Sequence, residues 1–291
     1  MRVLLLGATG TIGSPVLLEL VSNGHSVLAL ARSDAARDKL QNQQADVVRG
    51  DLREPSGWVK AVRDVDAIIH VAATFTEDMG GVDRAVVEAL INEAAADSVR
   101  RRFIYTGGCW LYGDTQGQAV SETAVLNPIP AFAWMVENAD RLRQVNCFDL
   151  NVVHPAMVYD QDGGVFAKFV EQAEGGGPVE VWGALETRWP VVHRDDLARA
   201  YRLVLEGGEA GQAYNVASQA GVSVGDIARA IMRRCQVSGD PVVRSVEDVV
   251  AEQGDWAVGP TLDQLMNANR ISEQLGWMPE HQDVVAVAGL T

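Results

Sequence analysis

Short apolar runs alternate with amphipathic stretches through the first half of the chain. The runs are rich in leucine and β-branched residues, as buried parallel strands are. They cover residues 2–6, 26–31, 46–50, 66–73 and 101–108. Helical periodicity between them predicts helices over residues 12–23, 34–43, 55–63 and 81–98. This alternation predicts an α/β fold built on a doubly wound parallel sheet, the Rossmann arrangement.

The predicted helix over residues 81–98 shows the periodicity well. Its apolar stripe is formed by Val82, Ala85, Val86, Ala89 and Leu90. Such a stripe predicts one face packed against the sheet and an opposite face in solvent.

The pattern loosens after residue 147. The sequence predicts strands over residues 148–159 and 213–218 and a helix over 223–235. Residues 188–206 are predicted as a strand that leads directly into a helix. We expect a Rossmann domain of residues 1–156, to which 189–217 returns, and a smaller, partly interleaved substrate lobe of residues 157–188 and 218–291.

The segment "LLLGATGTIGS" places Gly7, Gly10 and Gly13 between the first predicted strand and the first predicted helix. Gly7 permits a tight exit from the strand, Gly10 lets the backbone approach a pyrophosphate, and Gly13 lets the helix lie close to the sheet. The N–H groups and dipole at the helix start then face an anion. The turn therefore predicts dinucleotide binding.

The G-x-x-G-x-x-G spacing resembles that of the short-chain dehydrogenase/reductase superfamily. Later segments resemble its extended branch, the NAD(P)-dependent epimerase/dehydratase type, in the same order along nearly the whole chain. They are "GDL" (50–52), "HVAA" (70–73), "YTGGCWLYG" (105–113), "HPAMVYD" (154–160), "VVHRDDLARA" (191–200), "AYNVAS" (213–218) and "ANRISEQLGWMP" (268–279).

This resemblance implies a nicotinamide cofactor, with Asp51 directed to the adenine amino group and Pro155 near the nicotinamide carboxamide. The cofactor-binding residues it implies are Gly7, Thr9, Gly10, Thr11, Ile12, Gly13, Asp51, Leu52, Ala72, Ala73, Thr74, Thr106 and Pro155.

The end of the second predicted strand bears on the choice of cofactor. An NAD enzyme needs a carboxylate there to accept from the ribose 2′-hydroxyl, whereas this chain has Ala31 and Arg32. A guanidinium at that point can bind a 2′-phosphate. The alternative is an arginine in solvent that pairs with Asp34 or Asp38. We predict NADP(H), with NAD as the alternative.

The family's catalytic set is missing. The family uses a Tyr, a Lys four residues later on the same helix face, and an upstream Ser or Thr. Aligned on "NPIPAFAWMVE" (127–137), Ile129 takes the Tyr position and Ala133 the Lys position, while Gly107 or Gly108 takes the Ser position. None of the five tyrosines is followed four residues later by a lysine.

Tyr112 is the candidate proton donor that remains, because it lies just beyond the fifth predicted strand, on the edge of the sheet where ligands bind. The alternative is a packed ring. Thr106 is expected to hydrogen-bond the cofactor. Cys109 has no basic neighbour in sequence that would lower its pKa.

Four further titratable residues have structural interpretations. His154 and His193 are expected to be satisfied structural histidines at strand ends. Asp195 and Asp196 are expected to be the cap and first-turn carboxylates of a helix.

Aromatic residues stand where polar groups are expected. The predicted substrate-lining residues are Trp110, Phe132, Trp134, Met157, Trp182, Arg188 and Trp189. If the aromatics line a cleft, the ligand is flat and apolar; the alternative is that they are core residues. Arg188 and Arg270 are the two residues nominated for an anionic group.

Composition narrows the function classes. The net charge of −15 disfavours nucleic acid and anionic membranes as partners, because both need a basic face. Three widely spaced cysteines suit reduced thiols in the cytoplasm and provide no zinc motif, so we expect no metal.

These observations predict an NADP(H)-dependent oxidoreductase acting on a small, largely apolar carbonyl or conjugated metabolite. Two alternatives stay open: a non-catalytic NAD(P)-binding regulatory or sensor protein, and an epimerase or dehydratase with relocated acid and base residues. Residues 81–98 and 131–146 correspond to the helices that pair family members into dimers, so we also expect that a homodimer can form.

Overall fold

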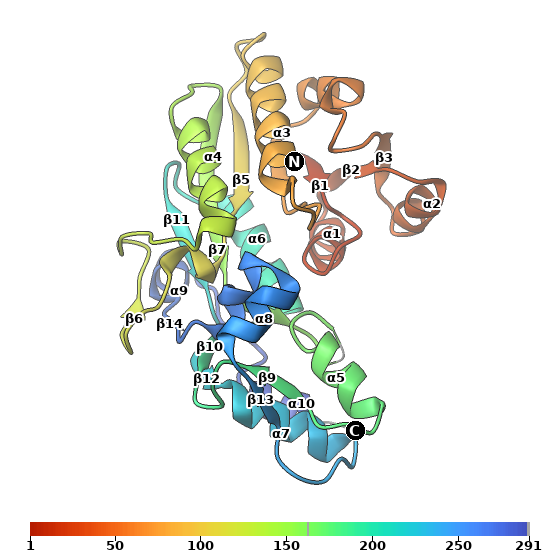
Figure 1. The fold of residues 1–291 in the computed structure, drawn as a ribbon. Coiled ribbons are helices and arrows are strands. Elements are labelled where there is room, and N and C mark those ends of the chain that lie inside the picture. The colour runs from red at the N-terminus through yellow and green to blue at the C-terminus, as the bar shows by residue number, and fades with distance from the viewer. Residues whose placement is uncertain (162, 290–291) are drawn as a thin grey trace. The chain divides into compact units, whose positions relative to one another are not determined.

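The computed structural model describes residues 1–161 and 163–289 (Figure 1). Among these residues, seven strands form one sheet in the order β11-β7-β5-β4-β1-β2-β3. All neighbouring pairs from β3 to β7 are parallel. The strands are β1 (Arg2–Leu6), β2 (Ser26–Ala31), β3 (Asp46–Arg49), β4 (Ala67–His70), β5 (Arg101–Thr106), β7 (Phe148–Pro155) and β11 (Ala213–Val216).

Helices pack on both faces of this sheet. They are α1 (Gly13–Ser22), α2 (Asp34–Asn42), α3 (Met79–Ala94), α4 (Ala133–Arg143) and α6 (Arg194–Gly207). Helices α3 and α4 lie beside each other, where Asn138 donates a hydrogen bond to Asp83 (Figure 1). Helices α1 and α6 are joined by Arg202, whose Nε donates to Glu19 at 2.7 Å. The predicted doubly wound Rossmann fold is confirmed.

The order of the strands reverses between β1 and β4, the first of which continues to β2 and the second to β5. In open α/β sheets, ligands bind outside the carboxyl ends of the strands at such a reversal. The glycine turn follows β1, and residues 72–74 follow β4.

By the spacing of their Cα atoms, the described residues divide into two compact units. The first comprises Met1–Gly107, Trp134–Val153 and Leu197–Tyr214. The second comprises Gly108–Ala133, His154–Asp196 and the residues from Asn215 to 289. The lobe boundaries expected from the sequence, at 156/157, 188/189 and 217/218, stay a prediction.

The second unit holds three small sheets. Strands β12 (Gln219–Ser223), β10 (Arg188–His193) and β8 (Met157–Tyr159) form one; β13 (Val242–Arg244) pairs with β9 (Glu180–Trp182), and β14 (Leu265–Met266) with β6 (Ala119–Val120). Its helices include α5 (Ala167–Glu174), α7 (Val224–Arg234), α8 (Val246–Gln253), α9 (Asn269–Leu275) and α10 (Val284–Ala288). Throughout residues 1–161 and 163–289, the helices are too short or too polar to cross a bilayer.

Two predicted elements differ in the structure. Residues 55–63 were expected as one helix, but the chain forms two 3₁₀ helices, Pro55–Gly57 and Val59–Asp64. Trp58 lies between them with φ −137°, because its buried indole donates from Nε1 to the Asp51 carbonyl at 2.8 Å. The strand expected over 148–159 is divided at Ala156, which donates its N–H to Val216.

The apolar face of α3 is also rotated from the prediction. Ala85 is exposed, whereas Val87 and Asp83 are buried with Val86 and Leu90. This face includes Asp83, whose carboxylate accepts hydrogen bonds from Tyr105 on β5 and from Asn138 on α4.

Candidate cofactor and ligand site

The turn between β1 and α1 has little room for side chains. Gly7 has φ +94°, and a Cβ there would lie 2.8 Å from the Ala72 Cα. A Cβ on Gly13 would lie 2.0 Å from the Gly7 carbonyl oxygen. The Gly10 N–H donates to that same oxygen at 3.0 Å, which closes the turn. The tight contacts at Gly7 and Gly13 therefore account for two of the three glycines.

The start of α1 fits an anion. Its N-cap is Ile12, and among the described residues no side chain caps the helix there. Uncapped N–H groups and the helix dipole favour a phosphate at such a terminus. Thr9 and Thr11 belong to the same turn. The predicted phosphate-binding residues are thus together, and the turn fits the pyrophosphate of a dinucleotide.

Arg32 is placed at the end of β2, with a side chain that is 80% exposed. Its Nε lies 4.0 Å from the Asp51 carboxylate, the one predicted to meet adenine. Asp34, which was an alternative partner for Arg32, instead forms ion pairs with Arg37 and Arg49. The contact with Asp51 is long, so it holds the exposed guanidinium of Arg32 only weakly.

Four predicted cofactor residues line a single pocket in the first unit. They are Leu52, Ala72, Ala73 and Thr74. The remaining lining comes from α3, from His70 at the end of β4 and from Trp134. Trp134 packs on Gly80, where a Cβ would lie 2.8 Å from the indole. Trp134 thus lines the same pocket of the first unit as these four residues.

At the wall of this pocket, three buried polar side chains converge on the carboxylate of Asp83. Tyr105 donates to Asp83 at 2.6 Å and Asn138 donates to it at 2.8 Å, while His70 Nε2 lies 2.9 Å from its other oxygen. Burial opposes ionisation, but His70 and the two hydrogen bonds outweigh it and lower the pKa of Asp83. The group is therefore a carboxylate buried inside a hydrogen-bonded network.

The pattern of the sequence does not reveal this network as a whole. A signal was available, because Asp83 lies between apolar residues at helical spacing and a charged residue on a buried stripe requires partners. The partners themselves come from β4, β5 and α4, which only the fold brings together.

Thr106 and Pro155 lie at the carboxyl ends of β5 and β7. The Thr106 hydroxyl is 2.6 Å from the Tyr201 hydroxyl on α6, and either group can donate. Burial raises the pKa of Tyr201, so it remains a phenol. Thr106 is thus anchored at the carboxyl edge of the sheet, and its contact with a cofactor stays a prediction.

Tyr112 lies in the 3₁₀ turn Cys109–Tyr112, and its ring is buried. Its hydroxyl donates to Asn215 Oδ1 at 2.7 Å, and the Asn215 N–H donates to Glu122 at 2.9 Å. Burial, assisted by the charge of Glu122, raises the pKa of Tyr112. The phenol is therefore a weaker acid than an exposed tyrosine. Burial also raises the pKa of the neighbouring Cys109 thiol to about 12.

Helix α4 begins where the family's catalytic tyrosine and lysine are expected, but this chain has neither residue there. Ile129 has extended backbone and precedes the 3₁₀ turn Pro130–Phe132, and α4 begins at Ala133. Neither Ile129 nor Ala133 carries an ionisable group, so this helix offers no acid or base at those two positions.

Three of the predicted aromatic residues of the second unit, Trp110, Phe132 and Trp189, lie in two pairs of contacting rings. Trp110 contacts Phe132 with ring centroids 5.3 Å apart, and its indole covers Gly259, where a Cβ would lie 2.5 Å away. Trp189 stacks on Phe169 and donates from Nε1 to the Pro260 carbonyl, so the chain at 259–260 links both pairs.

The other predicted lining residues lie elsewhere in that unit. Trp182 contacts Trp256 at 5.7 Å and lies under Lys168. Met157 is buried in β8. Arg188 donates from Nε and Nη2 to Asp263 at 2.9 and 2.5 Å, so its charge is paired. Arg270 lies 3.8 Å from Glu122.

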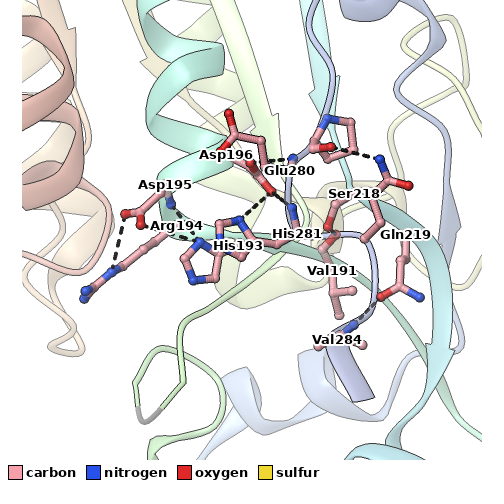
Figure 2. A network of polar contacts seen from close by, with 12 residues as sticks. Val191, His193, Arg194, Asp195, Asp196, Ser218, Gln219, Glu280, His281 and Val284 are labelled. Carbon is pink, nitrogen blue, oxygen red and sulfur yellow. Dashed lines mark hydrogen bonds and ion pairs between the residues drawn. The ribbon is translucent and has the colours of Figure 1, made fainter. Parts of the chain in front are cut away.

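The histidines and aspartates near α6 form a network at its first turn. Asp195 and Asp196 lie in that turn, and Asp196 accepts from the N–H groups of Glu280 and His281, each at 2.9 Å (Figure 2). Trp277 also donates to the Asp196 carbonyl. His193 accepts from the Asp195 N–H at 3.3 Å. This network fixes residues 277–281 to the end of β10.

Comparisons with known proteins agree with this geometry. The model of the NAD dependent epimerase/dehydratase family matches residues 3–217. The uncharacterized protein YLL056C of Saccharomyces cerevisiae is 28% identical over 291 residues, covering 96% of this chain and 95% of that protein.

Two solved structures share the fold at lower identity. The dTDP-glucose 4,6-dehydratase DesIV of Streptomyces venezuelae, with NAD and TYD bound, has a TM-score of 0.83 at 20% identity, covering 99% of this chain and 95% of that one. The human epimerase family protein SDR39U1 with NADPH has a TM-score of 0.80 at 16% identity, covering 99% and 98%.

Proposed function

This chain belongs to the NAD dependent epimerase/dehydratase family, and from that premise we propose that it is an NADP(H)-dependent oxidoreductase acting on a small, largely apolar carbonyl or conjugated metabolite. The observation that carries the choice of cofactor is the end of β2, where Arg32 is exposed and the carboxylate expected for NAD is missing. A guanidinium at this point binds a 2′-phosphate by charge-assisted hydrogen bonds.

The cofactor-binding residues are proposed from their places at the carboxyl edge of the sheet. Gly7, Gly10 and Gly13 with the start of α1 would hold the pyrophosphate, and Asp51 and Leu52 the adenine. Residues 72–74, Thr106 and Pro155 would lie along the rest of the dinucleotide. The nicotinamide, when bound, supplies the hydride.

The chemistry is limited by what replaces the family's catalytic set. Without a tyrosine–lysine pair at Ile129 and Ala133, the chain lacks the base that removes a proton from an unactivated alcohol. A general acid or base contributes about 10²–10⁴ in rate, whereas orientation alone can contribute about 7–11 kcal/mol. We therefore propose reduction of an electrophilic substrate, for which orientation suffices.

The proton that completes the reduction would come from water or from Tyr112. Tyr112 can serve only when ligand binding frees its hydroxyl from Asn215, because that hydrogen bond and the raised pKa both hold its proton. Trp110 and Phe132, which follow β5 and precede α4, are proposed to contact the apolar substrate.

Fluorescence titration tests the choice of cofactor. We expect NADPH to bind at least about tenfold more tightly than NADH, and Arg32→Ala to remove most of that difference. Arg37→Ala is the matched control, because Arg37 is on the same surface but is paired with Asp38 and Asp34. Equal affinities of the native protein for both cofactors would contradict the NADP(H) proposal.

A regulatory role is the second candidate. It is favoured by the same observation, that Ile129 and Ala133 take the places of the family's catalytic tyrosine and lysine. Oxidation of NADPH, followed with a panel of quinones and conjugated aldehydes, separates the two. Turnover supports the oxidoreductase. Tight but unequal binding of NADPH and NADP⁺ without turnover supports the sensor.

We also propose a homodimer that pairs α3 and α4 of one copy with the same helices of another. Small exposed residues on α3, such as Gly81 and Ala85, leave room for another helix to pack closely against it. Sedimentation measures the mass directly, and Ala85→Arg is expected to shift a dimer to monomer.

A further inference from the structure

Phe75 combines two unfavourable features in one residue. Its backbone has φ +51°, in the left-handed region that disfavours residues with large side chains. The residue is 85% exposed, so its ring gains little from burial. Backbone strain of this kind persists only where the surrounding structure enforces it, and such residues cluster at functional sites.

The segment around Phe75 is braced on both sides. The Thr76 hydroxyl lies 2.9 Å from the Thr74 hydroxyl and 2.7 Å from the Asp78 carboxylate. Arg53 donates from Nη2 to both Thr76 and Asp78 at 3.0 Å. These contacts tie the residues after β4 to those after β3, and they join residues on both sides of Phe75.

Phe75 lies at the edge of the sheet where ligands bind in folds of this topology. It follows β4, one of the two strands at which the sheet order reverses. Its neighbour Thr74 lines the pocket that contains Leu52 and Ala73. The residues that follow it, Thr76, Glu77 and Asp78, are polar. A single ring among polar residues is too small for a protein interface, which buries about 800 Å² on each partner.

We propose that Phe75 is a specificity-determining residue, whose ring stacks on the flat, conjugated part of the substrate at the carboxyl edge of β4. This inference rests on the proposed function and names its substrate class: planar conjugated carbonyl compounds such as quinones. Stacking uses the exposed face of the ring and requires no hydrogen bond, which suits a ligand with few polar atoms.

The test is equilibrium binding of 9,10-phenanthrenequinone to the full-length protein saturated with NADP⁺. Phe75→Ala is expected to raise the Kd of the quinone by about tenfold, and Phe75→Tyr to leave it within about twofold. Val125→Ala removes another apolar side chain, which is 89% exposed, and should change nothing. Phe75→Gly deletes the ring while relieving the backbone, so it separates loss of stacking from misfolding.

The outcomes distinguish the inference from the function it rests on. Loss of quinone binding in both Phe75→Ala and Phe75→Gly, with NADPH affinity unchanged, supports the proposal. Unchanged quinone affinity in these variants overturns it, as does failure of the native protein to bind the quinone. Failure of the native protein to bind NADPH overturns the proposed function itself.

Discussion

The imidazoles of His193 and His281 stack face to face, with ring centroids 3.7 Å apart and planes inclined by 19°. Two protonated rings at this distance repel each other. His193 also accepts the Asp195 N–H at Nδ1, which requires an unprotonated nitrogen. The folded protein therefore favours the neutral form of His193.

Some charged neighbours of His193 raise its pKa and others lower it. Burial is the main cause that lowers the pKa of His193, followed by the charge of His281; Asp195 and Asp196 raise it, and Arg194 lowers it. The net result is a pKa below the ordinary 6.5. Tyr159, which contacts the ring edge-on, is kept neutral by burial, which raises its pKa to about 12.

Stability should consequently fall in mildly acidic solution. Above pH 6.5, His193 is neutral in both the folded and the unfolded state, so it does not change the free energy of unfolding. As the pH falls from 6.5 through the lowered pKa of the folded state, His193 is protonated first in the unfolded chain, which lowers the free energy of unfolding. We expect the free energy of unfolding of the native protein to decrease relative to His193→Gln over that window. Urea unfolding between pH 7.5 and 5 measures this, and parallel curves for the two proteins would refute it.

The three glycines of the first turn should respond differently to alanine. A Cβ on Gly10 meets only the Gly7 carbonyl oxygen, at 3.4 Å, whereas one on Gly13 would lie 2.0 Å from that atom. We expect Gly10→Ala to keep the native melting temperature but to weaken NADPH binding by at least about tenfold, because it blocks approach to the pyrophosphate. Gly13→Ala should lower the melting temperature. Calorimetry and thermal melts check both, and normal NADPH affinity in Gly10→Ala would argue against pyrophosphate at this turn.

Removing the carboxylate of Asp83 should destabilise the first unit. Asp83→Ala leaves Tyr105 and Asn138 as buried donors without their acceptor, for which we expect a loss of about 3 kcal/mol. Asp140→Ala is the control, because Asp140 pairs with Arg143 at the surface and should cost less than about 1 kcal/mol. Chemical denaturation compares them. Similar losses would mean that the buried network contributes little.

Tyr112→Phe separates proton transfer from packing. Loss of the hydrogen bond to Asn215 should reduce stability by about 1 kcal/mol. If water supplies the proton, as the raised pKa of Tyr112 leads us to expect, kcat with a reducible quinone stays within about fivefold of native. A fall of about 10² or more would instead identify Tyr112 as the general acid.

Local pattern was sufficient to predict the sheet and the tight glycine turn after β1. Buried parallel strands are short apolar runs, and glycines at fixed spacing have a steric cause that Gly7 and Gly13 illustrate directly. The prediction of one helix at 55–63 is wrong: Trp58 interrupts it, and its indole donates to the carbonyl of Asp51, which lies outside the segment whose periodicity predicted the helix.

The ligand site was predictable only in part, for a related reason. Leu52 and residues 72–74 were assigned by resemblance, and the structure brings them into one pocket. Asp83, His70, Tyr105 and Asn138 come from four separate elements, so no window of sequence contains their relationship. Arg53, which follows β3, donates hydrogen bonds to Thr76 beside Phe75, and local propensity does not report this contact.

The attachment of Glu280 and His281 to Asp196 has a consequence for biosynthesis. Their backbone N–H groups lie 84 and 85 residues after Asp196, whose carboxylate accepts their hydrogen bonds. On the ribosome, Asp196 therefore emerges long before these amides exist, and water must solvate its carboxylate in the meantime. The first turn of α6 can reach its native, dehydrated state only after translation has passed position 281.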